Sequence, residues 1–477
     1  MRFRDAHHEL HLVGGWVRDA VLGREHGKEI DFATDAKPAE VIRILQGWAD
    51  SRKLVGIRYG TVGARKGQFD LEITTFREEV YKEDSRHPEV TFAREIEADL
   101  SRRDFTINAM AVRLPDGELI DPFRGLYDLA HGHLRTPLEP EISFGDDPLR
   151  MLRAARFVST LRVKPLPEVV QGIARMHERL RIVSPERIQS ELSKLLLGTH
   201  VDRALVLIVD TGLADVFLPE LPSLRLEQDP VHRHKDVFRH TLAVVKRCEP
   251  DVVLRLAALL HDIGKPKTRE ITPDGVQFHH HEVVGARMAE ERLRALRYPE
   301  RDIQDVKLLI ELHLRFHTFG AGWTDGAVRR YVRDAGPLLD KLNQLTRADC
   351  TTQNPKKAAM FGRLQDELEE RIARLAEQEN LAAIRPPLDG HQIMEHLGLD
   401  PGPLVGEARE FLLEQRLEHG PIEEEEAYRR LEEWARKRGV RGGSSPRARM
   451  HEGEKASGPP GANEGIWPPE QGSAPAG

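Results

Sequence analysis

The sequence predicts an α+β protein in which a small α/β unit precedes a long helical region. Short strand-like runs separated by two helical segments occupy residues 1–138. From Asp146 onward, apolar residues recur at helical spacing almost without interruption. The last segment, 441–477, is rich in Gly, Pro, Ser, Ala and charge and has almost no large apolar residues, which predicts disorder.

The elements follow in order from local patterns. Strands are expected at 10–13, 29–32, 60–65 and 69–76, and a strand or strand–helix junction at 106–114. Helices are expected over 16–22 and 38–48, because Gly23 suits a helix C-terminus and Pro38 suits a first helical turn. Later helical segments are expected at 148–161, 201–217, 236–262, 283–296, 302–316, 326–348, 356–380 and 403–438.

Composition limits the class of protein. The 477 residues suffice for about three domains. Cys248 and Cys350 are the only cysteines, so we expect no disulfide scaffold and a cytoplasmic location. No apolar run reaches the ~18–20 residues of a membrane span, so no membrane partner is expected. The net charge of −7 disfavours indiscriminate nucleic-acid coating but permits a local basic groove, and nothing indicates the oligomeric state.

The segment VGGWVRD places two glycines just before a predicted helix. Gly14 and Gly15 would let backbone N–H groups approach a phosphate where the helix N-terminus adds positive potential. Arg18, in the first turn, could add a bidentate contact to the same phosphates. A tight strand-to-helix turn without a ligand is the alternative interpretation.

The strand EIDFATD carries a pair of acids. Because side chains alternate along a strand, Glu29 and Asp31 face one way and Ile30 packs the other way. Two carboxylates on one face suit Mg²⁺ ions that clamp a triphosphate and activate a 3′-hydroxyl. Glu72, in FDLEITTFR, is a candidate third carboxylate. Solvated acids on an exposed strand are the alternative.

Four blocks in this order, LVGGWVRDAVLG, EIDFATDA, SRRDFTINAMAV and FGDDPLRMLRAARF, resemble the class II tRNA nucleotidyltransferase and bacterial poly(A) polymerase family. The resemblance spans roughly residues 10–220 and implies a head with the polymerase-β nucleotidyltransferase fold. It implies triphosphate contact for Gly15 and Arg18, and metal binding for Glu29 and Asp31. The family's metal motif is usually Asp-x-Asp, so Glu29 is a departure that leaves a weakened transferase possible.

The resemblance also implies a base-reading site. It places Arg103 against the nucleotide and Asp104 near its ribose. Asp147, Arg150, Arg153 and Arg156 recur every three residues and would form one inclined helical stripe. Asp147 would accept from an exocyclic amine while Arg150 donates to the ring, a pairing that suits cytosine and adenine. A solvated charged helix face is the alternative.

The later helices resemble HD-domain phosphohydrolases in the order of their metal-binding residues, which are His240, His261, Asp262 and Asp349. Imidazole with carboxylate suits a transition metal such as Mn, Fe, Ni or Zn, and a metal-bound hydroxide could attack a phosphoester. Further ligands could come from His279, His280, His281 or His313, of which we favour His281 within the triplet. A helical scaffold for RNA without hydrolysis is the alternative.

The predicted domains are a nucleotidyltransferase head (1–138), a helical neck for nucleobase and RNA binding (139–225), an HD domain (226–352) and a helical C-terminal region (353–440). The predicted function is template-independent addition of CCA to the 3′ end of tRNA from CTP and ATP, with the acceptor arm bound by its shape. Poly(A) polymerase or partial A- or C-addition is the first alternative. An RNA-binding HD phosphohydrolase with a degenerate head, and a pure RNA-binding module, are the others.

Overall fold

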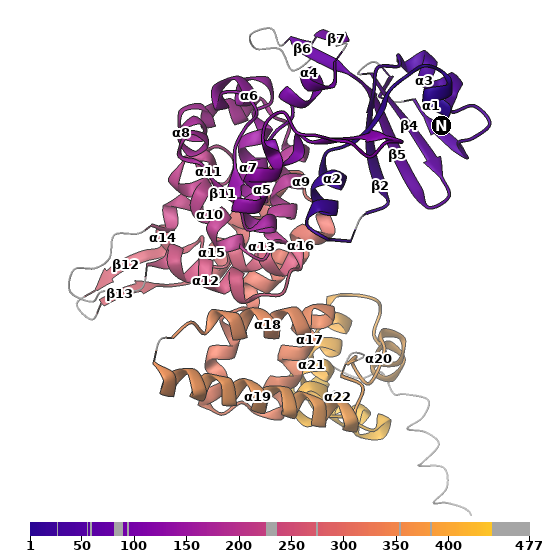
Figure 1. Cartoon of the computed structure of the whole chain (residues 1–477). Coiled ribbons are helices and arrows are strands. Elements are labelled where there is room, and N and C mark those ends of the chain that lie inside the picture. Colours follow the sequence, from indigo (N-terminus) through magenta and orange to yellow (C-terminus); the bar gives the residue numbers. More distant parts are fainter. Residues whose placement is uncertain are drawn as a thin grey trace, which may run out of the picture. The chain divides into compact units, whose positions relative to one another are not determined.

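The computed structural model describes residues 1–25, 27–54, 56–57, 60–80, 89–92, 95–225, 236–272, 275–352, 354–381 and 384–440. It divides into two compact units, Met1–Gly320 with Pro337–Asp366, and Ala321–Gly336 with Glu367–Gly477 (Figure 1). The predicted disordered tail, 441–477, lies outside the described residues. Among the described helices, none combines the length and the apolar character that crossing a bilayer requires.

One mixed sheet forms the head. Its strand order is β3-β4-β5-β2-β1-β8-β9, and β2 runs parallel to β5 while the other neighbours are antiparallel. The strands are β1 Leu10–Val13, β2 Glu29–Thr34, β3 Ser51–Lys53, β4 Thr61–Lys66, β5 Phe69–Thr75, β8 Ala111–Leu114 and β9 Leu119–Ile120. A separate antiparallel pair joins β6 Arg77–Val80 to β7 Glu89–Phe92. The strands predicted at 10–13, 29–32, 60–65 and 69–76 are confirmed.

Short helices accompany this sheet: α1 Arg2–Asp5, α2 Gly15–Val21, α3 Pro38–Ile44, α4 Ile96–Ser101 and α5 Gly125–His131. The helix predicted to run to Trp48 ends at Ile44 instead. The segment 106–114 is the predicted junction, with a 3₁₀ turn at Thr106–Asn108 followed by β8. Val41, Val62 and Ile73 belong to a buried cluster under one part of the sheet, which fixes the orientation of β2 and β5.

The helical region that follows packs around its own apolar faces. Its helices are α6 Pro140–Asp146, α7 Leu149–Leu161, α8 Pro167–Met176, α9 Pro185–Leu196, α10 Val201–Asp210, α11 Leu213–Phe217, α12 Val237–Arg247, α13 Val252–Leu260, α14 Lys265–Thr268, α15 His281–Ala295, α16 Glu300–Leu312 and α18 Leu339–Asp349. The predicted fold class is confirmed, but two short strand pairs that the sequence did not predict accompany these helices. A parallel pair joins β10 His133–Leu134 to β11 Lys164–Pro165, and a hairpin joins β12 Arg269–Thr272 to β13 Gly275–Phe278.

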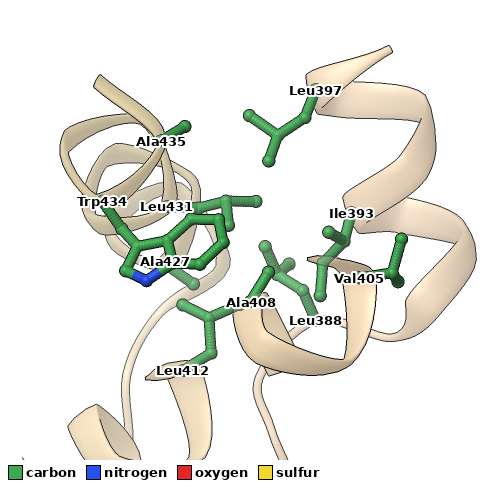
Figure 2. Packing of buried hydrophobic residues seen from close by; sticks show 10 residues of the cluster. All are labelled: Leu388, Ile393, Leu397, Val405, Ala408, Leu412, Ala427, Leu431, Trp434 and Ala435. Carbon is green, nitrogen blue, oxygen red and sulfur yellow. The ribbon is translucent and has the colours of Figure 1, made fainter. Parts of the chain in front are cut away.

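The second unit has a separate hydrophobic core. Its helices are α17 Asp325–Ala335, α20 Gly390–Leu397, α21 Pro403–His419 and α22 Glu424–Lys437, and the long α19 Pro355–Gln378 leads into it. Figure 2 shows how Trp434 and Leu431 of α22 meet Leu412 of α21 and Ile393 of α20. Continuous burial of these side chains makes this helical group a unit with a core of its own.

One buried group in the head predicts a pH-dependent stability. His11 on β1 is fully buried against Phe76, and within the described residues neither ring nitrogen has a hydrogen-bond partner. Burial lowers the pKa of His11 below its usual value, although Glu9 opposes this shift. Below about pH 6.5, His11 is therefore protonated in the unfolded chain but stays neutral in the folded head.

We expect the stability of the wild type to be maintained above pH 6.5 and to decrease as the pH falls toward the folded-state pKa of His11, with a limiting slope of about 1.4 kcal/mol per pH unit. His11→Leu removes this proton. Thermal unfolding of both proteins between pH 7.5 and 5.0 measures the effect, and the variant should gain stability relative to the wild type as the pH falls. A difference in Tm that stays constant over this range would contradict the prediction.

Candidate active site and metal cluster

Three carboxylates lie on one face of the head sheet. Along β2 the exposure alternates, so that Glu29 and Asp31 are exposed while Ile30 packs toward the core, as the sequence predicted. Parallel pairing of β2 with β5 places Glu72 directly beside Asp31 in the register. Glu72 was only a candidate from sequence, and the strand pairing brings it to the same site.

The electrostatics of this face favour a cation. Although Asp31 is accessible to solvent, it lies in the wall of a pocket, and partial desolvation there raises its pKa, which Arg103 opposes and Glu29 reinforces. Burial also raises the pKa of Glu72, and the charges of Asp31 and Glu29 add to the shift. Among the described residues, no Lys, Arg or His forms an ion pair with any of the three acids. Mutually repelling carboxylates with hard oxygen atoms fit divalent ions such as Mg²⁺.

The glycine turn lies against these acids. Gly14 has a φ of +73°, and a Cβ there would come within 3.2 Å of Arg103 Nη1 and 3.6 Å of Asp31 Oδ2. The position therefore favours glycine for its positive φ, and a larger residue would also press on the guanidinium of Arg103. Arg103 is oriented by a hydrogen bond to Asp99 Oδ2 at 3.1 Å, so its guanidinium is fixed between a buried acid and the turn.

Arg18 lies beside this turn in a different arrangement from the one expected. Its Nε and Nη2 donate to Asp19, and its Nη1 donates to Asn108 Oδ1 at 2.8 Å. Asn108 lines the pocket described below, whereas Arg18 is not among the lining residues. In this conformation the guanidinium of Arg18 is held by Asp19 and Asn108, and Asn108 links it to the pocket, while its contact with phosphate stays a prediction.

The predicted stripe of one carboxylate and three arginines is wrong in its first member. Asp147 has extended backbone angles between α6 and α7, because Pro148 follows it and α7 begins only at Leu149. Its Oδ1 accepts from Leu149 N at 3.1 Å and its Oδ2 accepts from Arg187 at 2.7 Å. Asp147 thus precedes the helix and is held by a residue of α9.

The three arginines of α7 have separate partners. Arg150 is buried and donates to the main-chain oxygens of Ser143 and Arg102, which tie α6 and the head to α7. Arg153 pairs with Asp104 at 2.6 Å, and its charge helps hold the pKa of that buried acid below its usual value against the opposing effect of burial.

Arg156 has a different partner from the other two arginines. It pairs with Glu191 of α9 at 2.9 Å and lies over the Phe157 ring at 4.3 Å. It does not line the pocket. The structure therefore separates Arg156 from the predicted base-reading group and gives it a helix-to-helix contact.

A pocket of about 500 Å³ collects most of the predicted residues. This volume lies within the range of small-ligand sites. It is bounded by the head sheet, the glycine turn and the start of α7, and is lined by Val13, Gly14, Gly15, Asp31, Phe32, Thr61, Glu72, Thr74, Asp99, Arg102, Arg103, Asp104, Asn108, Asp147, Arg150 and Arg153. Its walls combine acids, arginines and the backbone of the glycine turn, a lining that fits a nucleotide with bound metal.

A second cluster lies among α12, α13, α15, α16 and α18. His240 Nε2 lies 2.8 Å from Asp349 Oδ1 and 3.6 Å from Asp262 Oδ2, and His261 Nε2 lies 3.2 Å from Asp262 Oδ2. The structure thus brings together all four residues predicted from the His…His-Asp…Asp order. His240 is on α12, His261 and Asp262 follow α13, and Asp349 ends α18.

Two more histidines enter this cluster. His281 Nε2 lies 3.4 Å from Asp262 Oδ1, and the ring of His313 lies 5.6 Å from that of His281. Within the triplet, His280 has a φ of +56° and precedes α15, so His281 is the first residue to face inward. His280 is exposed and His279 bonds to Gln277 instead.

The donor set of the cluster fits metal ions. Potential ligands form two groups of mutually close atoms that share Asp262: one with His240 and His261, the other with His281 and His313. Asp262 Oδ1 and His281 Nε2 are buried and have no hydrogen-bond partner among the described residues. Three of the rings bond a main-chain carbonyl through Nδ1, which orients Nε2 as ligating histidines require; they are His261, His281 and His313.

Sequence reasoning missed residues that fix the site from a distance. Asp99 orients Arg102 and Arg103 through ion pairs, and Asn108 accepts a hydrogen bond from Arg18. Arg187 holds Asp147 from 40 positions along the chain. In the second cluster, Thr351 lies 2.7 Å from His240 Nδ1 and His317 lies 3.4 Å from Asp349. The spacing of Asp99 from Arg102 and Arg103 is a local signal that could have been used, whereas the other contacts join separate elements and leave no local pattern.

Three family models match successive parts of the chain. Residues 10–135 match the poly A polymerase head domain, 164–224 a probable RNA- and SrmB-binding site of polymerase A, and 237–378 the HD domain. The A-adding tRNA nucleotidyltransferase of Deinococcus radiodurans is 34% identical over 439 residues, which cover 89% of this chain and 95% of that protein. The CCA-adding enzyme of Anoxybacillus flavithermus is 31% identical, covering 90% and 93%.

Among solved structures, the CCA-adding enzyme of Bacillus stearothermophilus in complex with CTP is 27% identical, with a TM-score of 0.67 and coverage of 92% of this chain and 96% of that one. The similarity thus extends through the head, the neck, the HD region and most of the second unit. With relatives above 30% identity along nearly their whole length, the chain belongs to the family of the A-adding and CCA-adding tRNA nucleotidyltransferases.

Proposed function

We propose that this protein completes the 3′ end of tRNA by adding CCA from CTP and ATP, with release of pyrophosphate. The observation that carries the proposal is the convergence of Asp31, Glu72, the Gly14 turn and the start of α7 on one pocket. The 3′-oxygen of the tRNA attacks the α-phosphate, a new P–O bond forms, and the bond to the pyrophosphate leaving group breaks. Since tRNA is a cellular substrate, a cytoplasmic location is part of the proposal.

Catalysis would rest on the acids of the head. Glu29, Asp31 and Glu72 would hold Mg²⁺, which when bound neutralises the phosphates and stabilises the attacking and leaving oxygens. The open backbone at Gly14 and Gly15 admits the triphosphate close to these acids. Arg103, fixed by Asp99, lies where it can bind a phosphate oxygen or the sugar of the nucleotide.

Base selection would rest on Asp147 and Arg150. Both line the pocket, and both are oriented in advance by neighbouring groups. A carboxylate oxygen has more than one lone pair, so Asp147 can accept from a base amine while Arg187 still holds it. Cytosine and adenine each present an amine beside a ring acceptor, whereas guanine and uracil do not match this pattern.

Nucleotide incorporation separates this proposal from its alternatives. The protein is incubated with radiolabelled nucleotides, one at a time and together, and with tRNA lacking CCA, CA or A. We expect C on the first two tRNAs, A only after two C, and no G or U. Incorporation restricted to A on tRNA ending in CC would show an A-adding enzyme, and a long A tail would show a poly(A) polymerase.

The second cluster supports a further proposal, that the HD region binds divalent transition-metal ions. The mixed imidazole and carboxylate donors favour such metals over Mg²⁺, and the two ligand groups around Asp262 offer two adjacent positions. A bound ion could supply a hydroxide for hydrolysis of a phosphoester such as a 2′,3′-cyclic phosphate. Turnover of such an ester, lost in His261→Ala, would establish this activity.

A further inference from the structure

An exposed column of stacked side chains lies on the short helix α5 and the strand that follows it. Arg124 Cζ lies 4.5 Å from the centre of the Tyr127 ring, and that ring stacks on His131 at 4.0 Å with an interplanar angle of 28°. His131 in turn lies 5.8 Å from His133 at 31°. We call these four residues the stacking column: Arg124, Tyr127, His131 and His133.

The column is not part of the packing that holds α5 in place. The buried face of α5 consists of Gly125, Asp128 and Leu129. Gly125 packs on the main chain of Thr106 so closely that a Cβ would clash at 2.1 Å. Asp128 accepts from Arg135 and Thr106 beneath the helix. Tyr127, by contrast, is 43% exposed.

The surroundings of the column are basic. The helix α5 and the β10–β11 pair lie together beside α7 (Figure 1). Lys164 pairs with His133 in the strand register, and Arg162 follows α7 next to Gly132; both side chains are exposed. In the described part of the chain, neither Lys164 nor Arg162 forms an ion pair. The nearby acid Asp128 pairs with Arg135 instead.

At the start of α10, Arg203, Arg162 and Lys246 act on His200, and Asp202 opposes them. The charges of Arg203 and Arg162 add to the effect of burial and lower the pKa of His200. Arg162 and Lys164 lie beside the stacking column, whose rings are partly exposed to solvent. Such a combination fits nucleic acid, because every base offers a face for stacking and every nucleotide adds a negative phosphate. Protein interfaces also favour Tyr and Arg but are depleted in Lys, so Lys164, which has no ion pair among the described residues, favours nucleic acid over a protein partner.

We propose that the stacking column binds an unpaired base of the tRNA substrate outside the nucleotide pocket, while Arg162 and Lys164 bind the adjacent phosphates. The inference rests on the proposed tRNA substrate and adds a contact surface to it. The α5 helix is anchored on the turn at Thr106–Asn108, whose last residue lines the pocket. A base held there would position the RNA relative to the head.

The test measures RNA binding apart from chemistry. The dissociation constant of full-length protein for tRNA lacking CCA is measured by fluorescence titration for the wild type and Tyr127→Ala/His131→Ala. Loss of base–aromatic stacking is expected to weaken binding about 10-fold. The KM for CTP and the Tm of the double variant should equal those of the wild type. The conservative variant Tyr127→Phe, which keeps the ring, should bind tRNA like the wild type. Leu126→Ala, which trims a 41% exposed neighbour on α5, is the matched control and should bind like the wild type.

Two results would overturn the inference. One is a double variant that binds tRNA within about twofold of the wild type, as it would if the surface served a protein partner. The other is a double variant whose KM for CTP rises while its affinity for tRNA is unchanged. The proposed function is tested separately, by nucleotide incorporation with the wild-type protein. A wild type that binds tRNA but does not extend it would refute the proposed function, while the titration would still test whether the stacking column binds RNA.

Discussion

Asp31→Asn is expected to lower the rate of nucleotide incorporation at least about 10³-fold, because divalent-metal catalysis contributes several kcal/mol of transition-state stabilisation. The substitution keeps the shape of the side chain and removes the central charge of the three acids. Single-turnover incorporation of CTP into tRNA lacking CCA, at saturating Mg²⁺, measures the effect.

Stability should move in the opposite direction. Burial and the neighbouring charge of Glu29 raise the pKa of Asp31, so its ionised form is unfavourable in the folded head without a cation. Removing that charge relieves the repulsion, and the Tm of Asp31→Asn without metal should equal or exceed that of the wild type. A purely structural role for Asp31 would instead lower the Tm together with the rate.

Two further variants sharpen the test. Asp70 lies on the same strand as Glu72 and pairs in register with Glu29, but Arg65 neutralises it at 2.7 Å. Asp70→Asn should therefore leave the rate within about threefold of the wild type, in contrast to Asp31→Asn. Glu29→Asp keeps a hard oxygen ligand and should retain activity. If Asp31→Asn and Asp70→Asn had equal effects, the site would not be where we place it.

Local patterns in the sequence were sufficient to predict the position of a side chain where that position depends on a single strand or helix. The alternation along β2 placed Glu29 and Asp31 on one face, because strand geometry depends only on neighbouring residues. Gly14 precedes α2 with a positive φ, as a close phosphate approach would require. The apolar α13 lies within the segment 236–262 that was predicted to be helical, and it ends just before His261 and Asp262.

Other features depended on contacts between distant segments. Glu72 reaches the acid pair only because β5 pairs in parallel with β2 in one register. Arg156 points to Glu191, and Asp147 to Arg187, because α9 packs against α7. Helical spacing describes only which side chains share a face of one helix. It cannot reveal these partners, because they lie on the neighbouring helix α9.

One error was local. The predicted helical stripe includes Asp147, although Pro148 restricts the residue before it and favours a break in the helix there.

In the triplet of histidines, the residue at which α15 starts decides which ring faces inward, and a sequence pattern places helix ends only to within one or two residues.

Asp262→Asn is expected to remove the metal ions of the HD cluster and leave tRNA extension intact. Asp262 is shared by both ligand groups, so its carboxylate is the one whose loss affects both positions. We expect protein purified without chelator to contain tightly bound transition metal, and the variant to lose at least about 10–100-fold in affinity. Inductively coupled plasma mass spectrometry of the two proteins measures this.

The triplet supplies a matched pair of histidine variants for the same measurement. His281→Ala removes a buried ring whose Nε2 is 3.4 Å from Asp262, while His280→Ala removes an exposed neighbour. Metal content should fall only in the first. Adding metal at about 100 times its dissociation constant should stabilise the wild type by about 2.7 kcal/mol and raise its Tm, with no such gain in Asp262→Asn. Equal metal content in all variants would contradict the assignment.

The two sites should respond independently, because they share no ligand. The acids of the head lie on β2 and β5, whereas the HD cluster draws on α12, the end of α13, α15, α16 and α18. Asp31→Asn should therefore keep its transition metal while losing nucleotide incorporation, and Asp262→Asn should show the reverse. If Asp262→Asn also abolished incorporation with an unchanged Tm, the HD metal would be required for transfer, and the cluster would act on the same reaction as the head.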